Sequence, residues 1–504
     1  MSRTPSLTTL GLDILINIMA FVKPADIISM RQTCKALYDY STCRVVWLNA
    51  VTEMAKEHCI MKATFPTASM NRQSLEHAAL SPAKFSILIG KSAEKEVHPV
   101  ACRLHIHYLC KKEMSEHGLG TDAYYYSSML LVPGGRFLIT AACPNIGAPS
   151  LLQLWDLGIY GLGYKTQALT CQAIPGEHLS LQSLSFAPNG NDVYLVSDYL
   201  PHPEASVTAR LQVIVHKITG FGESPKFMKI NEAVIPTPKS SPVAISGTSL
   251  ACFYGRAMVL IWDFERNVSA TWDCGLIPSR TRIYLNDDMV VFQVSKKLMF
   301  CKIPLLLPYN DGMTIHHNQC LSPPMTSLEL DSIPDSNFNA TAFHGIFLLP
   351  HSPWSSNAYS GDYLGFYNAS MSNISLFRLE HISSNNSRSV DTTRLPYHLL
   401  TTDNIESSDS IKFATALQNC DSNLIFTAVD DSYSDDFGYL DDRLWVYRLT
   451  LPTENTRELL MRTAMMYPPE GRKSMCQVEL CSATGRLCVR DDHNIFIVDY
   501  LNLS

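Results

Sequence analysis

The N-terminal segment has apolar residues on almost every side of a predicted helix. Between Leu12 and Val22 only Asp13 and Asn17 are polar, and their spacing of four places them on one helical face. A helix that is apolar around most of its circumference requires burial on most of its surface. Three helices of roughly 40 residues cannot supply that burial alone. The pattern therefore predicts that this segment packs against something else.

The order of residues in this segment resembles the F-box family. The matching positions are Leu10-Gly11-Leu12-Asp13-Ile14-Leu15, Ile18, Phe21-Val22, Asp26-Ile27-Ile28, Cys34-Lys35 and Val46-Trp47. The sequence departs from the family at Gly11, where proline is usual, and at Asp13, where glutamate is usual. Glycine is expected to loosen the lead-in to the helix. The alternative is an N-terminal helical hairpin that folds onto the rest of the chain.

The resemblance implies an F-box domain at residues 1–50 that docks a Skp-type adaptor by apolar helix packing. The adaptor-binding residues that it implies are Leu10, Gly11, Leu12, Ile14, Leu15 and Ile18. Residues 51–103 are predicted to form a helical linker. Within it we expect a short helix at Leu75–Leu80 and a new helix at Ser81-Pro82, because a serine followed by proline often starts a helix.

From residue 104 onward the pattern changes to short apolar strands separated by turn residues. A phrase recurs in which an apolar strand ends on a bulky residue, then a charged one, then an apolar one. Its endings are Trp155-Asp156, His216-Lys217, Trp262-Asp263, Cys301-Lys302, Phe377-Arg378, Tyr447-Arg448 and Val498-Asp499. Such spacing is typical of stacked or radial repeats with loop insertions.

Residues 104–504 therefore resemble an irregular WD-like β-propeller of about seven blades that serves as a substrate domain. The fold class predicted for the whole chain is α+β and multidomain. The alternative for this region is a pair of β-sandwiches. The stretch Leu131–Ile139 and the later LQLWDLG also resemble the propeller-type F-box proteins of mushroom-forming fungi.

Composition narrows the class of partner and the compartment. The net charge is −7 and no Lys/Arg run exceeds two residues, which argues against a nucleic-acid partner. The 15 cysteines include no CxxC pair, as expected for reduced thiols in the cytoplasm or nucleus. No apolar run reaches the length of about 18 residues that a membrane span needs. Asn-x-Ser/Thr sequons such as Asn267-Val-Ser269 leave secretion as an alternative.

No catalytic, cofactor-binding or metal-binding residues are predicted. The spacing Cys102-x-x-His105-x-His107-x-x-Cys110 resembles a zinc site, since zinc prefers these ligands. The segment alternates like a strand, however, so the two histidines face away from the two cysteines. No dinucleotide loop, phosphate-binding loop or nucleophile elbow is present.

Residues 401–445 contain ten acidic residues against Lys412 and Arg443. The common interpretation is a solvated loop. The sharper hypothesis is that Asp430, Asp431, Asp435 and Asp436 dock a basic segment of a substrate, because complementary charge raises association rates.

Together these features predict a substrate-recognition subunit of an SCF-type cullin ubiquitin ligase. The F-box would bind a Skp-type adaptor and through it a cullin, and the propeller would hold an unknown protein substrate. The chain would need no catalytic residue and no cofactor. The alternatives are a propeller glycoside hydrolase, whose carboxylates would gather around a channel, and a non-degradative scaffold.

Overall fold

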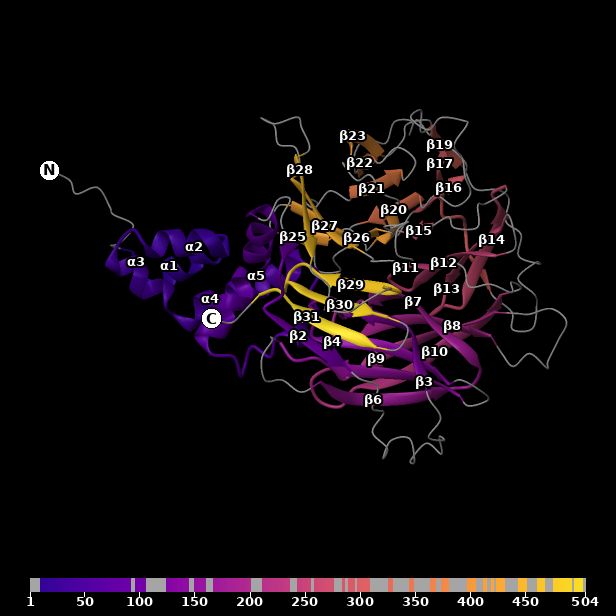
Figure 1. Cartoon of the computed structure of the whole chain (residues 1–504), viewed down its shortest axis with the longest axis horizontal. Helices are drawn as coiled ribbons and strands as arrows, with labels where there is room; N and C mark the ends of the chain where they lie inside the picture. The colour runs from indigo at the N-terminus through magenta and orange to yellow at the C-terminus, as the bar shows by residue number, and fades with distance from the viewer. Residues whose placement is uncertain are drawn as a thin grey trace, which may run out of the picture.

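The computed structural model shows a helical N-terminal part beside a β-rich body (Figure 1). The residues that it describes are 10–91, 96–105, 124–144, 149–159, 166–200, 211–235, 243–254, 258–275, 283–285, 289–294, 297–308, 325–329, 344–348, 363–368, 373–379, 397–404, 411–414, 418–420, 423–430, 443–450, 460–466, 475–491 and 494–501.

The N-terminal part consists of short helices followed by two longer ones. They are α1 (Leu12–Met19), α2 (Pro24–Arg31), α3 (Lys35–Ser41), α4 (Arg44–Glu57), the 3-10 helix η2 (Lys62–Thr64) and α5 (Arg72–Lys91). Pro24 suits the first position of α2 because the N–H of that position has no helical acceptor. Asp26 lies in the first turn, where its charge complements the helix dipole.

Helix α5 differs from the prediction of two separate helices. It runs without a break from Arg72 to Lys91 with Pro82 inside it, although proline removes one helical hydrogen bond. The Ser81 hydroxyl donates to His77 O at 2.7 Å, and Phe85 beyond the proline is fully buried. Tertiary packing therefore stabilises a continuous helix across Pro82, although local helix propensity predicts a helix boundary there.

The β-rich body consists of seven sheets among the described strands, named I to VII in chain order. Sheet I holds β3 (Tyr124–Leu131), β4 (Phe137–Pro144), β5 (Ser150–Asp156) and β6 (Gln167–Ile174), and sheet II holds β7 (Glu177–Phe186), β8 (Val193–Leu200), β9 (Leu211–Thr219) and β10 (Lys226–Ile235). Sheet III holds β11 (Val243–Ser246), β12 (Ser249–Tyr254), β13 (Met258–Asp263), β14 (Val268–Asp273) and β18 (Leu307–Pro308). Sheet IV holds β15 (Ile283–Leu285), β16 (Met289–Val294), β17 (Lys297–Lys302) and β19 (Met325–Glu329), and sheet V holds β20 (His344–Leu348), β21 (Tyr363–Asn368), β22 (Asn373–Leu379) and β23 (Tyr397–Asn404). Sheet VI holds β24 (Ile411–Ala414), β25 (Gln418–Cys420), β26 (Asn423–Asp430), β27 (Arg443–Thr450), β28 (Leu460–Met466) and β1 (Glu96–Val97), and sheet VII holds β29 (Gln477–Cys481), β30 (Arg486–Arg490), β31 (Ile495–Asp499) and β2 (Ala101–His105).

These sheets follow one another in a ring. The first strands of neighbouring sheets pack together, β3 beside β7, β7 beside β11, β11 beside β15 and β29 beside β3. The ring is closed by β2, which comes from the N-terminal side and pairs antiparallel with β31, with Ala101 opposite Asp499. Closure of this kind protects sheet edges. The body is therefore a β-propeller, and a pair of β-sandwiches does not describe this topology.

Each phrase ending identified in the sequence lies on the third strand of a described sheet, namely β5, β9, β13, β17, β22, β27 and β31. A third strand has a partner on both sides, which explains its apolar run; β31 is buried along its whole length. In sheets I and III the aspartate after the run orders the following turn. Asp156 accepts from Gly158 N at 2.8 Å and Asp263 accepts from Arg266 N at 3.0 Å.

The β region begins before residue 104, where the propeller was expected to start. Strand β2 begins at Ala101, and β1 pairs in parallel with Met465 and Met466 of β28. The side chain of Val97 in β1 is buried in the same apolar cluster as Phe85 of α5. The helices and the ring therefore share a continuous core.

Candidate functional site

Helix α1 has one packed side and one open side. Leu15 and Met19, four residues apart, are buried against α2, α3 and α4. Ile14, Asn17 and Phe21 occupy the opposite side, because residues three, four and seven apart share a helical face. Helix α1 ends at Met19, and Phe21 follows its C-cap Ala20 in a turn, where the Phe21 N–H donates to Ile18 O at 3.1 Å. The open side therefore presents large apolar side chains.

The structure divides the predicted adaptor-binding residues into two groups. Leu12 and Ile14 are 44% and 45% exposed, Gly11 is exposed, and Leu10 and Ile18 are partly buried. Leu15 is 0% exposed, so it has no surface left for direct contact with a partner. Its contribution to the predicted site is indirect, through the core that supports the open side of α1.

Three exposed apolar residues of this region were not among the predicted site residues. Phe21 is 92% exposed, Tyr38 52% and Val45 41%. A fully exposed phenylalanine is unusual, since its ring contributes most when it is removed from water. The spacing of seven residues between Ile14 and Phe21 was the available signal for Phe21. Nothing comparable in the pattern marked Tyr38 or Val45.

Gly11 does not disturb the start of α1. Its backbone has φ −64° and ψ 154°, a conformation that proline also adopts. Its carbonyl accepts from Leu15 N at 3.1 Å. The expected loosening therefore has no counterpart in the described conformation, and the helix begins as it would after the family's usual proline.

Trp47 lies at the centre of the small helical core. Its indole is fully buried, and its Nε1 donates to Ser41 O at 2.8 Å. The Arg31 guanidinium lies 5.5 Å from the ring centroid, within the range of a cation–π contact. These contacts connect α2, α3 and α4. The packed side of α1 therefore lies against a helical core with defined contacts, and its open side faces away from that core.

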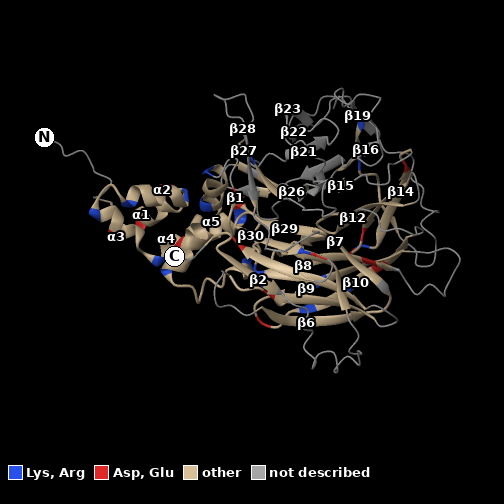
Figure 2. Ribbon diagram, in the orientation of Figure 1, with Lys and Arg blue, Asp and Glu red and all other residues tan. Residues whose placement is uncertain are grey.

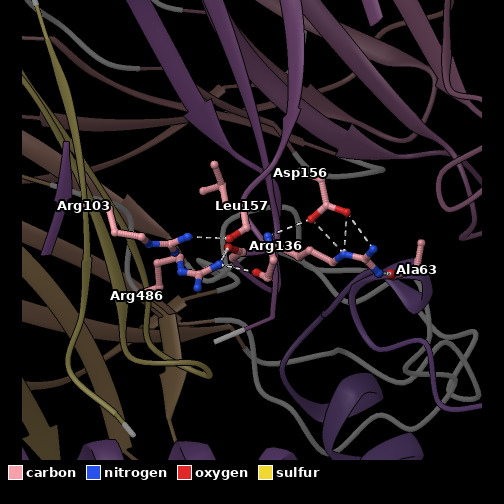
Figure 3. A network of polar contacts seen from close by, with 8 residues as sticks. Ala63, Arg103, Arg136, Asp156, Leu157 and Arg486 are labelled. Carbon is pink, nitrogen blue, oxygen red and sulfur yellow. Dashed lines mark hydrogen bonds and ion pairs between the residues drawn. The ribbon is translucent and has the colours of Figure 1, made fainter. Parts of the chain in front are cut away.

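The propeller is locked where its two ends meet (Figure 3). Arg486 of β30 donates to Gly135 O, Gly158 O and Asp499 Oδ1, each at 2.6 Å. Arg103 of the closing strand β2 binds the same Asp499 at 3.1 Å. It also donates to Leu157 O at 2.9 Å. A buried carboxylate between two guanidiniums thus joins sheet VII, the closing strand and sheet I.

The helical part is bonded to the same corner of sheet I. Arg136 pairs with Asp156 at 2.7 Å, and its Nη1 donates to Ala63 O at 2.9 Å. The N–H of Met61 donates to Pro133 O at 3.1 Å. These bonds place η2 against the turn between β3 and β4 (Figure 3).

The acidic candidates lie largely outside the described residues. Asp430 is the last residue of β26, opposite Arg443 of β27, while Asp431, Asp435 and Asp436 fall in the range that the structure does not describe. Elsewhere in the described chain, positive and negative residues are scattered over both the helices and the sheets (Figure 2).

The zinc-like spacing is only partly described. Cys102 is exposed while Arg103 points inward to Asp499, so neighbouring positions of β2 face opposite ways, as expected. His107 and Cys110 lie outside the described residues. Among the residues described, no group of three or more His, Cys, Asp or Glu could hold a metal ion. No described helix is both long and apolar enough to span a bilayer.

Comparison with known proteins identifies the N-terminal domain. Residues 7–49 match the F-box domain family, whereas no curated protein matches the chain. One similar solved structure is the C-terminal WD40 domain of Sif2, with 9% identity and TM-score 0.37, covering 76% of this chain and 100% of that one. Another is Drosophila Semaphorin 1b, extracellular domains 1-2, with 12% identity and TM-score 0.40, covering 81% and 88%.

Prolyl oligopeptidase B from Galerina marginata is also similar, with 9% identity and TM-score 0.36, covering 86% of this chain and 55% of that one. Because these identities and TM-scores are low, the propeller assignment rests on the strand topology described above. The chain therefore carries an F-box domain at residues 7–49, followed by a WD-like β-propeller.

Proposed function

We propose that this chain is the substrate-recognition subunit of an SCF-type cullin ubiquitin ligase, working in the cytoplasm or nucleus. The observation that carries the proposal is the open side of α1. It presents Ile14 and Phe21 on an F-box that is packed and bonded to a propeller. A Skp-type adaptor would cover this side together with Leu10, Gly11, Leu12 and Ile18, and would bring the cullin with it.

The mechanism is proximity rather than chemistry by this chain. The propeller would hold a protein substrate while the F-box holds the ligase, so substrate lysines meet the charged conjugating enzyme at a raised effective concentration. Apolar contacts join the helices to sheets I, VI and VII. They support this mechanism, because they keep the substrate-binding propeller and the adaptor-binding F-box in one connected body.

The acidic segment is the proposed substrate-docking element. Asn423, at the start of β26, lies beside α5, and its Nδ2 donates to Ser86 Oγ at 3.1 Å. Asp430 ends the same strand seven residues later, about 23 Å away at 3.3 Å per residue. The segment follows Asp430 directly and ends before Arg443, the residue opposite Asp430 on β27. Asp430, Asp431, Asp435 and Asp436 would attract a basic segment there.

Adaptor binding tests the first half of the proposal. Full-length protein is titrated with a purified Skp-type adaptor by calorimetry. Ile14→Asp and Phe21→Asp should each weaken binding at least about tenfold, because a charge in an apolar interface is costly. Met228→Asp is the matched control, since Met228 of β10 is 50% exposed but lies on the propeller. Wild-type affinity in the Phe21 variant would refute this adaptor face.

Ubiquitin transfer tests the second half. Partners captured by proximity labelling are added to the reconstituted complex with cullin and conjugating enzyme. Transfer to a captured partner supports the ligase, whereas binding without transfer indicates a non-degradative scaffold. Changing the four aspartates to asparagine should slow association and reduce its salt dependence. Unchanged capture across a salt series would remove the acidic segment from the proposal.

A further inference from the structure

Arg31 joins the F-box to the helix that contacts the propeller. From α2, its Nη1 and Nη2 donate to Oε1 and Oε2 of Glu76 in α5 at 2.8 and 3.0 Å. Its Nε donates to Ser41 Oγ at 2.9 Å, and its guanidinium lies over the Trp47 ring. A two-bond fork between guanidinium and carboxylate fixes direction as well as distance.

This fork supplements the attachment that the chain itself provides. The chain leaves the F-box through α4, whose Trp47 lies in the helical core and whose Met54 lies further along the same cluster. The F-box is attached further by Arg44 of α4, which donates to Met70 O at 3.3 Å, and by Ile27 of α2, which lies in the same apolar cluster as Leu75 of α5. A directional polar contact away from the axis of α4 adds a restraint on rocking about that axis. The α2–α5 fork is such a contact.

Helix α5 carries the restraint on to the propeller. Glu76 lies in its first half, and Phe85 and Ile89 in its second half pack with Leu444 of β27 and Leu487 of β30. The direction fixed at Glu76 is therefore transmitted through one helix to sheets VI and VII. Both partners of the ion pair are shielded, with side-chain exposures of 17% for Arg31 and 19% for Glu76, so salt screens the pair less than a surface pair.

We propose that Arg31 is a positioning residue which, with Glu76, fixes the orientation of the F-box relative to the propeller. The proposal rests on the proposed ligase function, because orientation then decides which lysines the bound conjugating enzyme can reach. The Arg31–Glu76 fork would leave adaptor affinity unchanged and restrict where ubiquitin is transferred.

The test uses variants of the full-length chain. Arg31→Gln and Glu76→Gln each remove the fork, and the exchange of Arg31→Glu with Glu76→Arg restores an ion pair at the same place. Lys56→Gln is the control, since it removes the exposed Lys56–Glu53 pair of α4, at 2.7 Å. Thermal unfolding confirms that each variant is folded before it is compared.

Orientation is measured without the ligase. Nitroxides attached to genetically encoded azido residues at the exposed positions 35 and 191 report the distance from the F-box to the turn between β7 and β8. The distance distribution should broaden in both single variants. It should keep the wild-type width in the exchanged pair and in Lys56→Gln. An unchanged width in Arg31→Gln overturns the proposal whatever the ligase activity.

Function is then measured in the reconstituted ligase. Adaptor affinity should stay within about twofold of wild type in all variants. Mass spectrometry of self-ubiquitination should show ubiquitin spread over more propeller lysines when the fork is broken, and the wild-type pattern in the exchanged pair. A wild-type pattern despite a broadened distance distribution refutes the positioning role. Failure of the wild-type chain to bind adaptor refutes the proposed function itself, and the distance measurement separates the two results.

Discussion

Neighbouring residues of α1 have opposite roles although both are large and aliphatic. Leu15 points into the helical core, whereas Ile14, one position earlier, is open to solvent. A step of one residue turns a helix by about 100°, which is enough to exchange burial for exposure. Since Leu15 has no exposed surface, its replacement would test the stability of the F-box rather than its contact with a partner.

A second residue-scale feature is the buried histidine of β9. His216 is fully buried, and neither ring nitrogen has a hydrogen-bond partner among the described contacts. Burial, with the nearby Lys229 charge adding to it, lowers the pKa of His216 to about 4 from 6.5. The folded chain therefore holds this imidazole neutral at pH values where the unfolded chain protonates it.

We therefore expect the free energy of unfolding to fall in acid, and we expect His216→Leu to make this fall smaller. Between pH 6.5 and about 4 the unfolded state binds the extra proton, so the free energy of unfolding falls as pH falls, by about 1.4 kcal/mol per unit. Above pH 6.5 the contribution is complete and constant. Urea unfolding at pH 7 and pH 5 should show a smaller difference for the variant than for wild type. His98→Leu, at an exposed position, should keep the wild-type difference, and equal behaviour of the two variants would contradict the prediction.

At the scale of elements, closure depends on one short strand that is far away in sequence. Strand β2 completes sheet VII beside β31, and Asp499 at the end of β31 binds both Arg486 and Arg103. The sequence pattern marked Val498-Asp499 only as a further repeat ending. The tertiary structure makes that aspartate the shared acceptor of two arginines.

Asp499→Asn should therefore be strongly destabilising. It removes the carboxylate from two buried or largely buried guanidiniums, and an uncompensated buried charge costs about 3–5 kcal/mol. Equilibrium urea unfolding measures the loss. Glu232→Gln is the control, because its pair with Lys229 is exposed and should change stability by less than about 1 kcal/mol. Similar losses in the two variants would show that the arginines do not depend on Asp499.

At the scale of the whole molecule, the F-box region and the propeller are not independent bodies. Apolar side chains of α4 and α5 lie in the same clusters as residues of sheets I, VI and VII. The predicted division at residue 104 would cut through β2, which spans Ala101–His105. A propeller separated there would lack Arg103 and the cover that α5 provides.

A fragment of residues 94–504 should consequently be less stable than the full chain. It keeps β1 and β2 but exposes the surface that Phe85 and Ile89 cover, and each such side chain contributes about 1.5–3 kcal/mol when buried. Calorimetry should show a lower melting temperature for 94–504. A fragment of 106–504, which also lacks the closing strand, should be lower still. A melting temperature equal to that of the full chain in either fragment would indicate an independent propeller.

The sequence alone determined the kinds of element and their order. Local periodicity predicted the F-box helices, and the phrase endings predicted one buried strand per sheet, because a strand flanked on both sides must be apolar along its length. Tertiary structure decided which side chains remain available. Packing buries Leu15 and leaves Phe21 exposed. It also keeps α5 continuous across Pro82 and brings Arg31 into an ion pair with Glu76. These outcomes depend on contacts between residues far apart in the chain, which no local pattern encodes.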